Sequence, residues 1–123
     1  MIIPEIKNII SPDLPAGELP ADPEECNIYV EATIGPNGQP GEEIFSFSVV
    51  TPKYLAHESR TQWGRGLLIV NAFPWKTVEH ALQKLLMHAY RGTWNEIAEI
   101  LNKEMHWEFE NNQEYDQDTS KNT

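Results

Sequence analysis

Two segments of alternating hydrophobicity, separated by a turn rich in glycine and proline, constrain the fold of this chain more than any other feature. In residues 27–34 an aliphatic residue or alanine occupies every second position, and residues 43–50 alternate in the same way. A period of two is that of a strand with one buried face. The intervening Gly35-Pro36-Asn37-Gly38 supplies the residues that a chain reversal needs. The sequence therefore predicts a hairpin with an acidic, glycine-rich tip.

Helical signals follow the hairpin. Thr51-Pro52 combines a capping hydroxyl with proline at the first helical position, which predicts a short helix over residues 52–59. Residues 77–90 carry apolar side chains at helical spacing. A capping box at 93–96 (TWNE) predicts a further helix that ends near Glu104.

Three more segments have the composition of strands. Residues 2–10 are rich in isoleucine, and Pro4 confines that strand to an edge or to a strand start. The continuous apolar run at 67–70 favours a central strand, and residues 105–110 alternate briefly. We therefore predict an α+β fold, an antiparallel sheet of four to five strands with two main helices packed on one face.

Length and charge set the domain organisation and restrict the partners. The 123 residues fit one domain, which we place at residues 1–110, before a disordered acidic tail at 111–123. The net charge is −10, made up of −8 in residues 1–43, +3 in 44–103 and −5 in 104–123. This balance works against nucleic acid and anionic membranes as partners and permits a basic protein.

The single cysteine, Cys26, cannot form an intramolecular disulfide, which favours a reducing compartment and hence the cytoplasm. No apolar run approaches the roughly 18 residues that a transmembrane helix needs. We expect no metal or other cofactor, because metal-ligand, phosphate-loop and dinucleotide motifs are all missing. Two alternatives stay open at this point: a small hydrolase using His106 and nearby carboxylates, or an acidic adaptor domain.

Four blocks in order resemble a known family. They are FSFSVVTPKYLA at 45–56, WGRGLLIV at 63–70, TWNEIA at 93–98 and HWEFE at 106–110. Together they resemble the immunity protein 8 family of bacterial polymorphic toxin and contact-dependent growth inhibition systems. The resemblance implies a small cytosolic α+β protein that is not an enzyme. It also implies that the protein binds the C-terminal domain of a toxin encoded beside it, often a nuclease.

The charges suggest which residues meet such a toxin. A blocker of a cationic nuclease needs a negative surface, since complementary charge speeds encounter and carboxylates can occupy phosphate-binding positions. We expect the main contact surface in the segment that carries Asp22, Glu24 and Glu25. The hairpin tip, at Glu42 and Glu43, is the second candidate.

Overall fold

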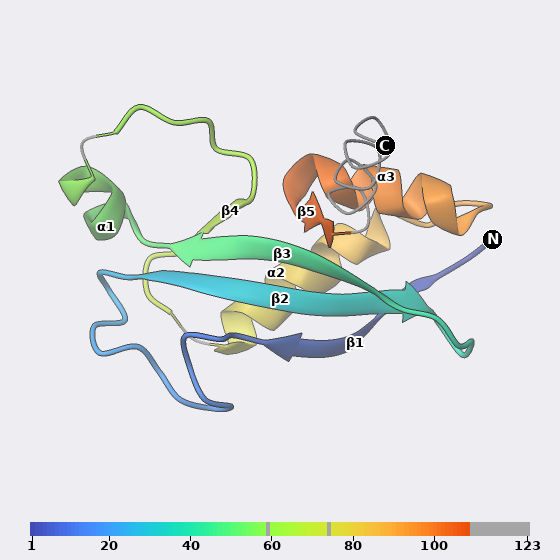
Figure 1. Ribbon diagram of the computed structural model, residues 1–123, viewed down its shortest axis with the longest axis horizontal. Coiled ribbons are helices and arrows are strands. Elements are labelled where there is room, and N and C mark those ends of the chain that lie inside the picture. Colours follow the sequence, from blue (N-terminus) through green and yellow to red (C-terminus); the bar gives the residue numbers. More distant parts are fainter. Residues whose placement is uncertain (59, 74, 109–123) are drawn as a thin grey trace, which may run out of the picture.

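The fold is a five-stranded sheet with three helices, in a computed structural model that describes residues 1–58, 60–73 and 75–108. Figure 1 shows the arrangement of the elements along the chain. Their bounds are β1 (Pro4–Ile10), β2 (Asn27–Pro36), β3 (Glu43–Val50), α1 (Pro52–His57), β4 (Leu67–Ile69), α2 (Trp75–Met87), α3 (Trp94–Glu104) and β5 (His106–Trp107). The α+β class is confirmed. The predicted tail at 111–123 lies outside the described residues.

The predicted hairpin forms the centre of the sheet. Strands β2 and β3 pair antiparallel from Asn27 opposite Val50 to Ile34 opposite Glu43. Every second residue of each strand is buried, as the alternation predicted. The buried side chains of the two strands form one wall of the core: Ile28, Val30, Ala32, Ile34, Phe45, Phe47 and Val49.

The remaining strands occupy the two edges of the sheet. Strand β1 pairs antiparallel with β2 and is an edge strand, as Pro4 predicted. The other side of β3 is shared between β4, which pairs parallel, and β5, which pairs antiparallel. The sheet is therefore mixed rather than wholly antiparallel.

The prediction that residues 67–70 form a central strand was wrong. Strand β4 spans three residues at an edge, and its Ile69 is 59% exposed. The run is apolar for a different reason: Leu68 packs partly against the core and Val70 is buried in it. Because β4 and β5 divide one side of β3, neither is flanked by a further strand in the described part of the chain.

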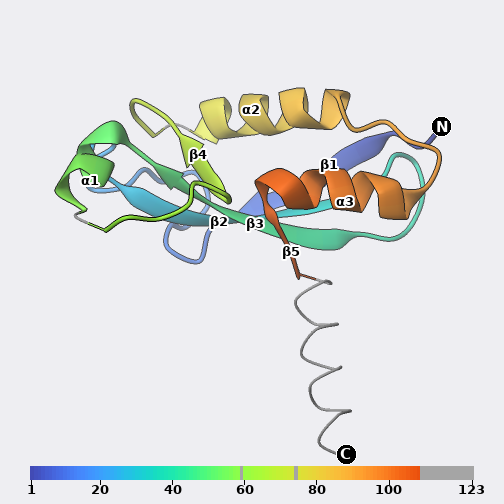
Figure 2. The same ribbon diagram turned by 90° about the horizontal axis from the view of Figure 1, so that it is seen from above.

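Helices α2 and α3 lie on the same face of the sheet, as predicted (Figure 2). Each buries one apolar stripe against the sheet. The start of α3 matches the predicted cap, because the Thr93 hydroxyl oxygen accepts the amide hydrogen of Glu96 at 3.2 Å. Helix α1 begins after Thr51 in the same way. Helix α2 starts two residues before the predicted 77 and ends at Met87.

Candidate functional site

The connection between β1 and β2 carries five exposed carboxylates. We call residues 11–25 the acidic loop (Figure 1). It contains no lysine or arginine. All five of its acidic residues are exposed: Asp13, Glu18, Asp22, Glu24 and Glu25.

Hydrogen bonds fix the first part of the acidic loop to β2. The Ser11 hydroxyl donates to the Tyr29 carbonyl oxygen at 2.5 Å, and the Tyr29 amide donates to Asp13 Oδ2 at 3.0 Å. The loop backbone turns back on itself, since the Leu14 amide donates to the Ser11 carbonyl oxygen at 3.4 Å. This part of the loop is thus held in one conformation against the sheet.

The second part of the acidic loop is fixed to the segment that begins α2. Trp75 Nε1–H donates to the Glu18 carbonyl oxygen at 2.9 Å, and the Phe73 amide donates to the Pro23 carbonyl oxygen at 2.9 Å. Both bonds use backbone oxygens of the loop. Neither bond therefore occupies a carboxylate oxygen of the loop.

The three residues that we expect to form the main contact surface, Asp22, Glu24 and Glu25, lie together at the end of the acidic loop, beside α1. Asp22 Oδ1 accepts the amide hydrogen of Glu24 at 3.0 Å, which closes a local turn. Glu24 Oε2 lies 3.9 Å from Lys53 Nζ, and Glu25 Oε2 lies 3.2 Å from His57 Nδ1. These are surface pairs, which contribute little to stability.

Thr51 joins α1 to the end of the acidic loop. Its side chain is fully buried, and its hydroxyl oxygen accepts the amide hydrogens of Tyr54 at 3.3 Å and Cys26 at 3.1 Å. The cap at Thr51 was predicted from sequence. The bond to Cys26, which lies 25 residues earlier, fixes the exit of the acidic loop into β2.

Burial, with a smaller contribution from the Asp22 carboxylate, raises the pKa of the Cys26 thiol. Because the thiolate is the reactive form, we expect iodoacetamide at pH 8 to alkylate Cys26 at least about tenfold more slowly in the folded protein than in urea. Mass spectrometry of timed samples measures both rates. Equal alkylation rates in the two states would show that the Cys26 thiol is accessible in the folded protein and that its pKa is not raised.

The hairpin tip places its two acidic residues differently. Glu42 is exposed, whereas Glu43 is half-buried at a core-facing position of β3. Glu43 Oε2 accepts hydrogen bonds from Trp107 Nε1 at 2.6 Å and from Trp94 Nε1 at 3.1 Å. This carboxylate joins β3, α3 and β5, a role that sequence reasoning missed.

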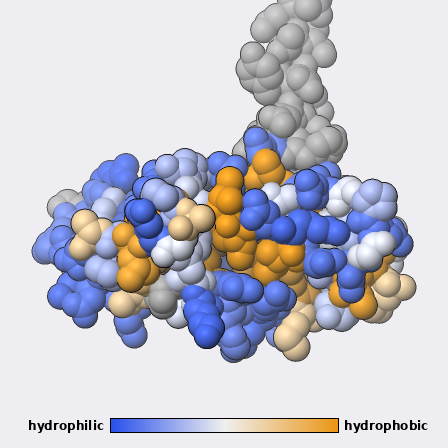
Figure 3. All heavy atoms as spheres, turned by 90° about the horizontal axis from the view of Figure 1, so that it is seen from below, coloured by the Kyte–Doolittle hydropathy of each residue, from blue (hydrophilic) through white to orange (hydrophobic). Residues whose placement is uncertain are grey.

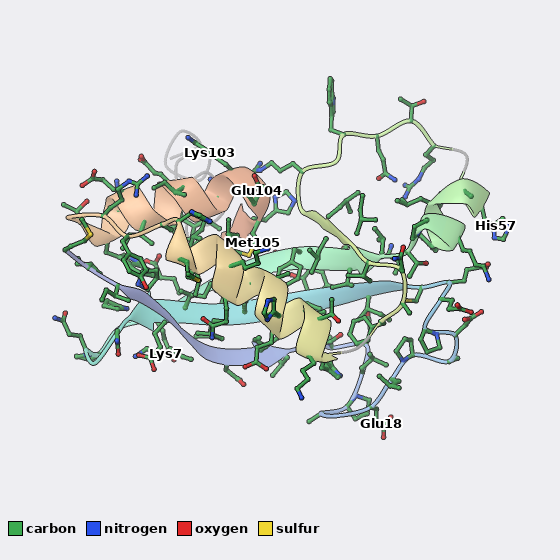
Figure 4. The ribbon with its side chains drawn as sticks, turned by 180° about the vertical axis from the view of Figure 1, so that it is seen from behind. Lys7, Glu18, His57, Lys103, Glu104 and Met105 are labelled. Atoms are coloured by element: carbon green, nitrogen blue, oxygen red, sulfur yellow. The ribbon has the colours of Figure 1, made fainter. Side chains whose placement is uncertain are left out.

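The structure does not bring the two acidic groups together. Glu24 and Glu25 precede the start of β2, while Glu42 and Glu43 stand opposite its other end. At about 3.3 Å per strand residue, the seven steps from Asn27 to Ile34 separate these groups by more than about 20 Å. In Figure 4 Glu18 and His57 accordingly lie toward one end of the molecule and Lys7 toward the other.

Within the WGRG segment at 63–66, Arg65 and Gly66 have a structural role, whereas Trp63 is 95% exposed. The Arg65 guanidinium donates to the Asn102 carbonyl oxygen at 2.6 and 3.0 Å and to the Met105 carbonyl oxygen at 3.3 Å. The Gly66 amide donates to the Glu104 carbonyl oxygen at 2.9 Å. Figure 4 shows this end of α3, labelled at Lys103 and Glu104, beside the segment that leads into β4. Arg65 thus binds carbonyl oxygens at the carboxyl end of α3.

His106 packs against the same glycine. A Cβ added to Gly66 would lie 2.5 Å from His106 Nε2, so a larger residue here would displace the imidazole. The φ of +80° at Gly66 favours glycine as well. Within residues 1–58, 60–73 and 75–108, no carboxylate makes a hydrogen bond or an ion pair with His106. The same residues contain no group of three potential metal ligands and no helix long and apolar enough to cross a membrane.

A protein-family model described as immunity protein 8 matches residues 5–112, which are 108 of the 123 residues. The chain belongs to the immunity protein 8 family. The match extends from the second residue of β1 through β5, and thus includes the acidic loop and both ends of the central hairpin. No curated protein and no solved structure matched the chain. Membership of the immunity protein 8 family makes this an immunity protein, whose partner is a toxin.

Proposed function

We propose that this immunity protein neutralises its toxin by stoichiometric binding of the toxin's C-terminal domain, and that this domain is cationic, as in a nuclease. The observation that carries the proposal is the acidic loop, in which five carboxylates are exposed while the backbone is held by hydrogen bonds. A loop that is already ordered loses little conformational entropy on binding. The acidic loop therefore offers a preformed negative surface.

The expected contacts follow from the placement of the carboxylates. Asp22, Glu24 and Glu25 form the main contact, because all three are exposed and the ion-pair partners of Glu24 and Glu25 lie at the surface. Glu42 gives a second contact at the hairpin tip. Glu43 contributes by holding that end of the sheet, since two indoles already occupy its carboxylate.

The proposed mode of action needs no turnover and no cofactor. Negative charge accelerates encounter with a cationic domain, and carboxylates at a desolvated interface take the positions that phosphates of a nucleic-acid substrate would occupy. Protection would operate in the cytoplasm, where a lone thiol such as Cys26 remains reduced.

We expect the double charge reversal Glu24→Lys/Glu25→Lys to weaken binding of the toxin domain encoded next to this gene at least about tenfold, because two attractive contacts become repulsive. Isothermal titration calorimetry with an inactivated toxin domain measures the affinity. The loss should shrink as salt is raised, since screening weakens charge pairs at the protein surface.

Glu99→Lys/Glu104→Lys is the matched control, because it changes the net charge equally at two exposed positions of α3. We expect this control to retain affinity within about threefold. Equal losses in both variants would mean that net charge alone matters and that the contact lies elsewhere. Absence of a wild-type complex at low salt would refute the binding proposal itself.

A further inference from the structure

A pocket of about 460 Å³ lies beside the acidic loop, at the β1 edge of the sheet. Its lining joins three elements: Ile9 and Ile10 at the end of β1, residues 11 and 14–17 of the acidic loop, and Trp75 and Glu79 at the start of α2. Figure 3 views this edge and shows apolar side chains gathered near its middle, between hydrophilic surfaces. A pocket of this size has room for at least one large apolar side chain.

The floor of the pocket is preformed. Ile9, Leu14 and Trp75 are half-buried and pack against the core. The Trp75 ring meets Phe73 edge-on with ring centroids 5.1 Å apart, and its Nε1–H is bonded to the loop backbone. The hollow is therefore present before any partner arrives.

The wall of the pocket exposes apolar surface on an edge strand. Ile10 is the last residue of β1 and is 49% exposed, and the neighbouring Ala16 is also exposed. An apolar hollow that is open to solvent at a strand edge gains free energy when a partner covers it.

The rim of the pocket is acidic. Glu79 contributes to the lining, and Asp13 and Glu18 adjoin lining residues of the loop in the sequence; all three are exposed, although Asp13 Oδ2 also accepts the Tyr29 amide hydrogen. The exposed Lys76 of α2 offsets one of these three negative charges. The pocket thus combines an apolar interior with negative charge around its mouth. This chemistry complements an apolar side chain flanked by lysine or arginine.

We propose that this pocket receives such an apolar anchor from the cationic surface of the toxin domain. The inference rests on the proposed function and deepens it, because it assigns the apolar centre of the interface. Interfaces commonly concentrate affinity in one anchor that fills a pocket, with charged contacts around it. Here the charged contacts are those of the acidic loop.

Two variants test the pocket without disturbing the core. Ala16→Trp places a large ring at its mouth, and Ile10→Ser removes apolar contact from its wall. We expect losses in affinity for the inactivated toxin domain of at least about 30-fold and about tenfold, respectively. Ile69→Ser is the matched control, because Ile69 is an exposed isoleucine of β4, on the opposite side of the sheet. We expect it to bind within about twofold of wild type.

Calorimetry at low and high salt separates this inference from the proposed function. The pocket variants should lose affinity by the same factor at both salt concentrations, because salt does not screen apolar contacts. The affinity loss caused by charge reversal should instead shrink at high salt. If the Ala16→Trp and Ile10→Ser variants both bind the toxin domain with wild-type affinity, the pocket assignment is overturned and the proposed function stands. Failure of the wild type to bind would overturn both. A wild-type homodimer in sedimentation that Ile10→Ser dissociates would instead assign the pocket to self-association and overturn the inference.

Discussion

Replacement of Glu43 by alanine should lower the free energy of unfolding by about 2–4 kcal/mol. The change removes the carboxylate oxygen that accepts the indole hydrogens of Trp94 and Trp107, at 3.1 and 2.6 Å. Each partly buried donor that loses its acceptor costs about 1–3 kcal/mol. Urea denaturation followed by tryptophan fluorescence measures the effect, because two of the four tryptophans lie at the altered site.

Two variants separate the hydrogen bonds from the charge. Glu43→Gln keeps a carbonyl oxygen as acceptor, so it should lose less than half as much stability as Glu43→Ala. Glu42→Ala, at the exposed neighbour, should change stability by less than about 0.5 kcal/mol. If Glu43→Ala were no more destabilising than Glu42→Ala, the two indole bonds would not hold β5 and α3 to the hairpin.

Replacement of Thr51 by valine should have an effect of similar size, about 2–4 kcal/mol. Valine matches the shape of threonine but has no oxygen, so the amide hydrogens of Cys26 and Tyr54 both lose their acceptor. Loss of a helix cap alone costs about 1 kcal/mol, and a backbone donor left unsatisfied in a buried site adds about 1–3 kcal/mol. Thermal and urea unfolding measure the total.

Thr51→Ser is the control for this prediction, because serine keeps the hydroxyl oxygen and removes only a methyl group. It should retain most of the stability that valine loses. Amide hydrogen exchange adds a local measure: the Cys26 amide should exchange faster in Thr51→Val and remain protected in Thr51→Ser. A valine variant as stable as wild type would show that the Cys26 bond is replaced by another.

The parts of the fold that the sequence predicted depend on local patterns. The alternation at 27–34 and 43–50 placed both hairpin strands, because a one-sided sheet imposes a period of two on its residues. Thr51 and Thr93 marked the starts of α1 and α3, because a capping hydroxyl acts within three residues of the chain.

The parts that could not be predicted depend on contacts between distant residues. An apolar run such as 67–70 is compatible with a central strand, and its edge position follows only from the way β4 and β5 divide one side of β3. Glu43 looked like a surface carboxylate at a hairpin tip, but the indoles that hold it come from positions 51 and 64 residues away. Arg65 likewise binds carbonyl oxygens 37 and 40 residues along the chain.

The way in which the acidic loop is fastened has a consequence for how this protein changes over evolution. The bonds from Trp75 and Phe73 reach the carbonyl oxygens of Glu18 and Pro23, which every amino acid possesses. Glu18, Asp22, Glu24 and Glu25 can therefore be exchanged for other residues without altering those two bonds. Under the proposed binding mode, mutations at these positions would alter which toxin is recognised while the scaffold persists, so that new specificities would arise by small sequence steps.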